Sequence, residues 1–145
     1  MTNKNKTYPF QYLQYDLQPD KIYYYRFRID GVINKEHDMV GKFRTASTAP
    51  SSYKITLVTC ATTGSNNSVF DRIREEEPLF YLMLGDFHYG NIRRDCSDEF
   101  YTHYAAVLGS KRQSELYQGT PIAYMWDDHD YVFHLLITIY CRKFD

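Results

Sequence analysis

Three groups of polar side chains have residue types suited to metal and phosphate chemistry. Each group follows a short apolar run, as a strand-end position would. The groups are Cys60, the segment 85–89 with Asp86 and Tyr89, and the run Asp127-Asp128-His129-Asp130. If the apolar runs are parallel strands of one sheet, all three groups lie at its carboxyl edge, where open α/β sheets bind ligands.

The chemistry of such a cluster depends on its charge. Several carboxylates gathered at one edge repel one another, and a multivalent cation relieves that repulsion. Carboxylates combined with the phenol of Tyr89 and the thiol of Cys60 suit a highly charged transition metal beside a harder, oxygen-seeking ion. His129 would serve as a proton donor or as a further ligand. A two-metal site of this kind activates water and clamps a phosphoryl group.

Each of these residues also has a simpler explanation. A cysteine at a strand end is more often a small buried hydrophobe, and Gly85-Asp86 is a common turn. Tyr89 is one of 15 tyrosines, so it carries little weight by itself. A structural or exposed position is the simpler expectation for His88, His103 and His134. The acidic run 127–130 is harder to explain without a function, because it directly follows an apolar strand.

Strands at 55–60, 79–84 and 122–126 would position these groups. The first strand has a buried-type composition, and the continuous apolar run 79–84 is typical of a strand covered on both faces. Helical segments separate the strands, so the order β-α-β-α-β predicts a parallel sheet.

The helices between these strands have recognisable ends. Asn67 or Ser68 caps the first, and Pro78 follows its end. Ser97 caps the second, with Asp98 and Glu99 in its first turn. Its expected apolar stripe consists of Phe100, Tyr101, Tyr104, Ala105 and Leu108. A third, short helix ends at Gly119.

The amino-terminal part has β character. Strands are expected at 13–17, 22–29 and 40–45, with a turn at 18–21. The small-residue segment 46–52 is the best domain boundary in the sequence. We therefore predict a β-unit with its linker over residues 1–50 and an α/β unit over residues 51–145.

Composition excludes several classes of protein. The chain has 145 residues, of which 43% are hydrophobic, and its net charge is −1, which argues against a disordered chain. That charge also lacks the basic excess of a nucleic-acid-binding protein. We expect no membrane span and no signal peptide in this sequence. Three scattered cysteines give no disulfide framework, and the compartment and the oligomeric state stay open.

Four segments, taken in order, resemble the PhoD-type alkaline phosphatases, a branch of the calcineurin-like metallophosphoesterases, and the strand 41–45 belongs to the first of them. The resemblance spans residues 13–131. It rests on Leu17-x-Pro19-x-x-x-Tyr23, the strand 41–45, Thr59-Cys60, Gly85-Asp86-x-x-Tyr89 and Trp126-Asp127-Asp128-His129-Asp130. The resemblance implies the amino-terminal part of an α/β metallophosphatase sandwich, preceded by the end of a fibronectin type III-like β-sandwich. The first segment also resembles the tyrosine corner of such sandwiches.

The resemblance implies a role for each matching residue. Cys60 and Tyr89 would bind a ferric ion, and Asp86 would bridge that ion to a second metal, calcium. Asp128 would bind the second metal. His129 would act on the substrate phosphate, with Asp130 orienting it. Substrates would be phosphomonoesters or phosphodiesters, hydrolysed without a covalent enzyme intermediate.

The sequence also departs from the family. The family continues past the last motif and places further metal ligands there, whereas 132–140 is here an apolar run. We therefore expect a fragment of the enzyme with an incomplete dinuclear site and inefficient turnover. The alternative is a catalytically inactive β plus α/β binding module that presents a tyrosine-rich surface.

Overall fold

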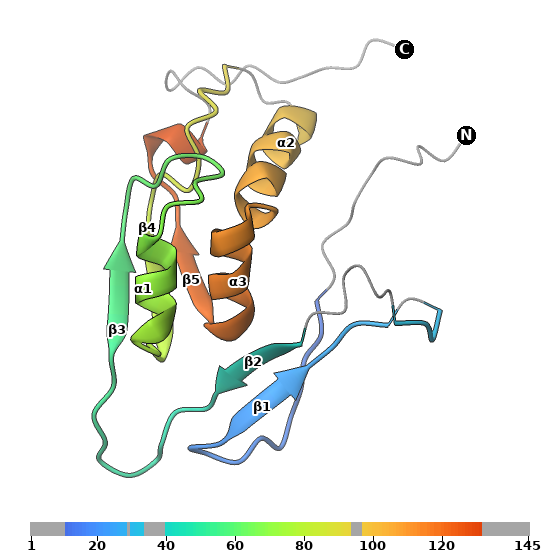
Figure 1. Cartoon of the computed structure of the whole chain (residues 1–145), viewed down its shortest axis with the longest axis vertical. Coiled ribbons are helices and arrows are strands. Elements are labelled where there is room, and N and C mark those ends of the chain that lie inside the picture. The colour runs from blue at the N-terminus through green and yellow to red at the C-terminus, as the bar shows by residue number, and fades with distance from the viewer. Residues whose placement is uncertain (1–10, 29, 34–39, 94–96, 132–145) are drawn as a thin grey trace.

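The computed structural model describes residues 11–28, 30–33, 40–93 and 97–131. They form a two-stranded antiparallel sheet followed by a mixed α/β unit (Figure 1). The predicted β-α-β-α-β order of the second unit is confirmed. Within the part of the chain that the structure describes, no helix is long and apolar enough to cross a membrane.

Strands β3 (Ile55–Val58), β4 (Phe80–Leu84) and β5 (Ile122–Met125) form the parallel sheet, with β4 in the centre. Helix α1 (Val69–Glu75) connects β3 to β4, and helices α2 (Ser97–Leu108) and α3 (Lys111–Gly119) connect β4 to β5. The strand order 3-4-5 advances in one direction. Because crossovers between parallel strands are right-handed, all three helices lie on the same face of the sheet (Figure 1).

The hydrophobic core fills the space between this face and the helices. Tyr81 and Met83 of β4 are fully buried there, together with Val107 of α2 and Leu116 of α3. Phe87, just after β4, is 3% exposed and completes the core at the carboxyl end of the sheet. The core therefore supports the loops that follow the strands.

The opposite face of the sheet is exposed, which contradicts the predicted two-sided burial of 79–84 and the buried-type prediction for 55–60. Leu82 on this face is half-buried, and five other apolar side chains are 37–64% exposed, the extremes being Phe80 and Leu57. They are Ile55, Leu57, Phe80, Leu84 and Met125. A second layer of helices would require the strand order to reverse, and this order does not.

The predicted helix ends are largely correct, while the predicted stripe on α2 is partly wrong. Ser68 is the N-cap residue of α1, and the side chain of Asn67 accepts the backbone N–H of Val69 at 3.0 Å. In α2, Tyr101 and Leu108 are exposed, whereas Val107 is fully buried. The buried face therefore passes through Tyr104 and Val107, on the Phe100 side of the predicted stripe, and leaves Tyr101 and Leu108 in solvent.

In the amino-terminal unit, β1 (Ile22–Tyr25) pairs antiparallel with β2 (Gly41–Arg44). The predicted strand 22–29 is thus shorter, and residue 29 lies outside the described residues. The strand predicted at 13–17 is wrong, because all of these residues are irregular. Alternation of apolar residues does not make a strand without a neighbouring strand to pair with.

Tyr23 makes the hydroxyl-to-backbone contact expected of a tyrosine corner. The backbone N–H of Gln18 donates to its hydroxyl at 2.8 Å, and its ring stacks on Phe43 with centroids 5.6 Å apart. The described residues show two strands in this unit, so the fibronectin-like sandwich and the boundary at residue 50 stay predictions.

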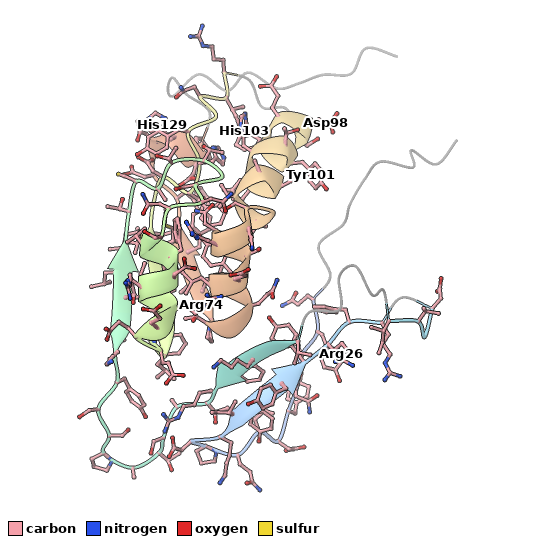
Figure 2. All side chains as sticks on the ribbon, in the orientation of Figure 1. Arg26, Arg74, Asp98, Tyr101, His103 and His129 are labelled. Carbon is pink, nitrogen blue, oxygen red and sulfur yellow. The ribbon has the colours of Figure 1, made fainter. Side chains whose placement is uncertain are left out.

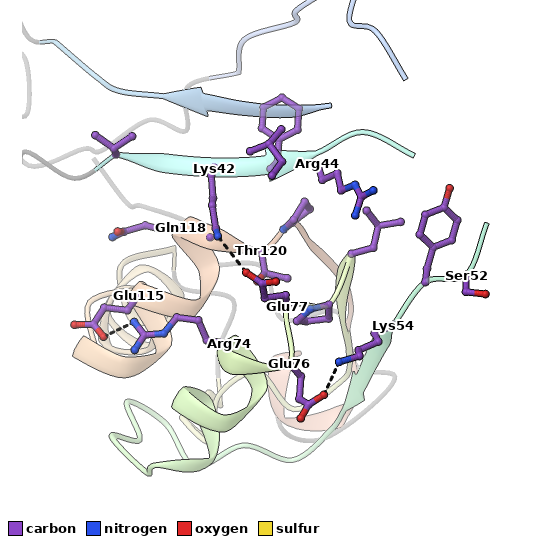
Figure 3. A pocket seen from close by; sticks show the side chains of 18 residues that line it. Lys42, Arg44, Ser52, Lys54, Arg74, Glu76, Glu77, Glu115, Gln118 and Thr120 are labelled. Atoms are coloured by element: carbon purple, nitrogen blue, oxygen red, sulfur yellow. Dashed lines mark hydrogen bonds and ion pairs between the residues drawn. The ribbon is translucent and has the colours of Figure 1, made fainter. Parts of the chain in front are cut away.

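A cleft of about 530 Å³ lies between β2 and the amino-terminal end of the parallel sheet (Figure 3). Ion pairs line it, with Lys54 Nζ 2.8 Å from Glu76 and Arg74 Nη1 2.8 Å from Glu115. The cleft is at the opposite end of the strands from the polar groups described above. Lys42 of β2 pairs with Glu77 across the cleft at 3.8 Å, so the cleft lies where the two units meet.

Candidate metal centre

The carboxyl ends of the three parallel strands converge, as the sequence predicts. The backbone N–H of Cys60, just after β3, donates to the carbonyl of Gly85, just after β4, at 3.2 Å. On the other side, Gly85 lies directly against Asp127, which follows β5. Residues far apart in the sequence therefore share one rim, near His129 in Figure 2.

The carboxylate of Asp86 contacts three other residues of this rim. Its side chain is 5% exposed, and its Oδ2 accepts the hydroxyl of Tyr89 at 2.9 Å and the thiol of Cys60 at 3.5 Å. Its Oδ1 accepts the backbone N–H of His129 at 3.3 Å. The structure thus brings Cys60, Asp86, Tyr89 and His129 together at one carboxylate.

Three of the residues here could share one metal ion. The ligand atoms of Asp86, Asp128 and His129 all lie within 4.8 Å of one another. Ligand atoms sit about 2.0–2.6 Å from zinc or calcium, so atoms this close together can bind a single ion. Asp86 is buried, His129 is half-buried and Asp128 is exposed, which leaves the group open to solvent on one side.

Backbone conformation at the rim is unusual for side chains that are not glycine. Cys60 has φ 59°, Asp86 has φ 55° and Asn91 has φ 49°, all in the left-handed region. Such conformations cost of order 1–3 kcal/mol each and gather at functional sites. At Cys60 and Asp86 this conformation turns the chain sharply after β3 and after β4. The two side chains meet as a result.

Gly85 makes the close approach of two strand ends possible. Its φ is +110°, and a Cβ built on it would lie 2.4 Å from Cβ of Asp127. We expect Gly85→Ala to lower the free energy of unfolding by about 3 kcal/mol, through backbone strain and this clash. Urea denaturation measures the change. Gly31→Ala is the matched control, because Gly31 also has positive φ but open space around it; equal losses for the two variants would contradict the clash.

Asp130 joins the β4 and β5 loops through the backbone. Its carboxylate is 4% exposed and accepts the backbone N–H groups of Phe87 at 2.7 Å, His88 at 3.3 Å and Asp127 at 3.2 Å. The resemblance implies that Asp130 orients His129, and this role stays a prediction. In the structure, the partner of His129 Nδ1 is Asn91 Oδ1, at 2.8 Å.

The charge state of the donors at this rim would depend on whether a cation is bound. The pKa of Tyr89 is raised well above its usual value, first by its hydrogen bond with Cys60 and then by desolvation and by Asp86. The phenol therefore holds its proton beside the carboxylate. A bound cation would reverse that preference, because a positive charge stabilises phenolate, thiolate and carboxylate together.

The sequence analysis missed two residues of this site. Asn91 contacts the imidazole of His129, and Thr63 Oγ1 accepts the backbone N–H of Tyr89 at 2.7 Å. Gly90-Asn91 reads only as a turn signal, and Thr63 lies in an unremarkable polar loop. Of the histidines expected to be structural or exposed, His88 is fully buried and His103 is half-buried. His134 lies outside the described residues.

The α/β unit contains an open parallel sheet with polar residues at the carboxyl ends of its strands. Open sheets of this class bind ligands at that edge. No protein-family model matches the chain, and no curated protein matches it either. A solved structure titled "Structure of PhoD" is similar in fold, with a TM-score of 0.61 at 19% identity. The similarity covers 78% of this chain and 25% of that one, so this chain spans about a quarter of the length of the PhoD chain.

Proposed function

We propose that the rim binds metal ions and belongs to a site for the hydrolysis of phosphate esters. The observation that carries this proposal is the gathering of Asp86, Asp128 and His129 ligand atoms within 4.8 Å. The similarity of the fold to part of PhoD supports the phosphoesterase class. A fragment of such an enzyme remains our interpretation of the chain.

The donor set fits the two ions that the resemblance implies. The thiol of Cys60 and the phenol of Tyr89 both reach Asp86 Oδ2, and such donors would hold a ferric ion. Asp86 would face both ions, and Asp128, an exposed carboxylate, would hold calcium. When bound, the ions would supply Lewis acidity and an activated water.

The other residues of the rim would act on the substrate. The imidazole of His129 is half-buried beside the acids, where it would stabilise charge on a phosphoryl oxygen or protonate the leaving oxygen. Asp130 would keep the β4 and β5 loops at a fixed distance through its backbone contacts. The substrate class we propose is phosphomonoesters or phosphodiesters.

A combined metal and activity assay tests this function. We expect the purified chain to take up iron and calcium, detected by elemental analysis after dialysis. Hydrolysis of p-nitrophenyl phosphate or its bis-ester should then depend on metal, stop with a chelator and return on reloading. The rate should be low, because the described residues supply few ligands for a second ion. A chain that takes up no metal would exclude the proposal.

The exposed apolar face of the sheet favours the alternative, a binding module, since such patches mark contact surfaces. Binding of a partner that persists in the presence of a chelator and in Asp128→Ala would support the binding module, because a phosphoesterase needs the metal group.

A further inference from the structure

Two large aromatic side chains lie on either side of the acidic run 127–130. Trp126 directly precedes the run, and Tyr131 directly follows it. Trp126 is 65% exposed and Tyr131 is 59% exposed. Aromatic rings usually bury most of their surface in a core or an interface. Core packing therefore does not account for two such rings in solvent beside a polar rim.

The turn between them brings the two rings together. Asp128–Asp130 form the short 3-10 helix η2, which is closed by a capping box. The carboxylate of Asp127 accepts the backbone N–H of Asp128 at 2.9 Å, and the backbone N–H of Asp127 donates to Asp130 at 3.2 Å. The rings of Trp126 and Tyr131 stack with centroids 5.7 Å apart and planes 1° from parallel. A stack covers one face of each ring, so the turn holds two parallel rings whose remaining surface is in solvent.

The two rings are close in the chain to the candidate metal group. Trp126 is two residues before Asp128, Tyr131 is two residues after His129, and Asp128 and His129 are both members of that group. Consecutive Cα atoms are 3.8 Å apart, so each aromatic Cα lies within about 8 Å of the Cα of a candidate ligand. An ester held at the rim by its phosphoryl group can therefore reach these rings with a substituent the size of an aryl group or a nucleoside.

Stacked aromatic side chains are suited to recognise planar rings. Tyrosine and tryptophan offer a large, rigid contact surface with only two side-chain torsions to fix, so little conformational entropy is lost when a ligand binds. Stacking accepts any nucleobase, because every base has a π-face. An aliphatic substituent has no such face, so it gains less from the contact.

We propose that Trp126 and Tyr131 form an aromatic platform, which selects phosphate esters whose substituent is a planar aromatic ring, an aryl group or a nucleobase. The hydrolysis of these esters rests on the proposed function. The stacking of the ligand rests only on the two rings and on their exposure.

Tryptophan fluorescence tests the platform directly, because Trp126 is the only tryptophan of the chain. We expect adenosine monophosphate and phenyl phosphate to quench it saturably, both with Mn²⁺ and with a chelator, and glycerol phosphate to leave it unchanged. The affinities of the two aromatic probes show whether a nucleobase or an aryl group fits better. No quenching by either aromatic probe, or equal quenching by glycerol phosphate, would overturn the proposal.

Three variants keep the fluorophore and test the second ring. Tyr131→Ala should weaken the binding of both aromatic probes by about 10-fold. Tyr131→Phe keeps the ring, and Tyr101→Ala removes an exposed tyrosine of α2, so both should bind like the wild type (Figure 2). Unchanged affinities in Tyr131→Ala would contradict a platform of two rings.

Hydrolysis tests the consequence for specificity. In the metal-loaded chain, we expect Tyr131→Ala to lower kcat/KM about 10-fold more for phenyl phosphate than for glycerol phosphate. Comparing variants in this way cancels the better leaving group of phenyl phosphate. Equal losses on the two esters would show that the stack only supports the turn, and would contradict the platform. A chain that hydrolyses neither ester would count against the proposed function, while the quenching would still decide the platform.

Discussion

Replacing Asp86 with asparagine is expected to lower the affinity of the chain for Mn²⁺ by about 100-fold or more, since outer-shell changes alone cost up to about 100-fold. Asp86 belongs to the group of ligand atoms within 4.8 Å, and it contacts both Cys60 and Tyr89. Asparagine keeps the shape of the side chain and can still accept the backbone N–H of His129, but it removes the charge. Isothermal titration calorimetry measures the loss, and circular dichroism checks that the fold is kept.

Asp98→Asn is the matched control for this experiment. Asp98 is an exposed acid in the first turn of α2, outside the candidate metal group (Figure 2). Its replacement makes the same change in net charge and should leave Mn²⁺ affinity nearly unchanged. Equal Mn²⁺ affinities for Asp86→Asn and the wild type would show that the ion binds elsewhere and would contradict the proposed metal site.

The sequence could predict the convergence at the rim because that depends on topology alone. Apolar runs separated by helical segments require parallel strands, and the carboxyl ends of parallel strands share one edge. Cys60, Asp86 and the run 127–130 each directly follow such a run. Their meeting therefore needs no knowledge of loops, whereas their individual roles remain predictions.

The side-chain contacts within the rim could not be predicted from residue types. They depend on left-handed backbone at Cys60, Asp86 and Asn91. Cysteine does not signal that conformation, and aspartate and asparagine, although enriched in it several-fold, adopt it at few of their positions. A small change of φ at Asn91 would move its amide away from His129. Sequence patterns carry little information about such turns, so they do not indicate the contact between Asn91 and His129.

The prediction that both faces of β3 and β4 are buried was wrong for a different reason. An apolar run identifies a strand that avoids water, but not which layer covers it. With the strand order 3-4-5, the helices cover the face of Tyr81 and Met83 and leave Leu57 and Leu84 exposed. The apolar composition of β3 and β4 is therefore consistent with a further layer on that face, which this part of the chain does not supply.

Asp130→Ala is expected to destabilise the fold by about 3 kcal/mol, a large part of the roughly 5–15 kcal/mol that stabilises a domain. The carboxylate is buried and accepts three backbone N–H groups from both loops, and alanine would leave these donors without a partner. Urea denaturation measures the loss. Asp128→Ala, at an exposed position on the same turn, is the control and should change stability by less than about 0.5 kcal/mol. If Asp130→Ala kept full stability yet abolished hydrolysis, Asp130 would act on His129 or the substrate, as the resemblance implies, and not through the backbone.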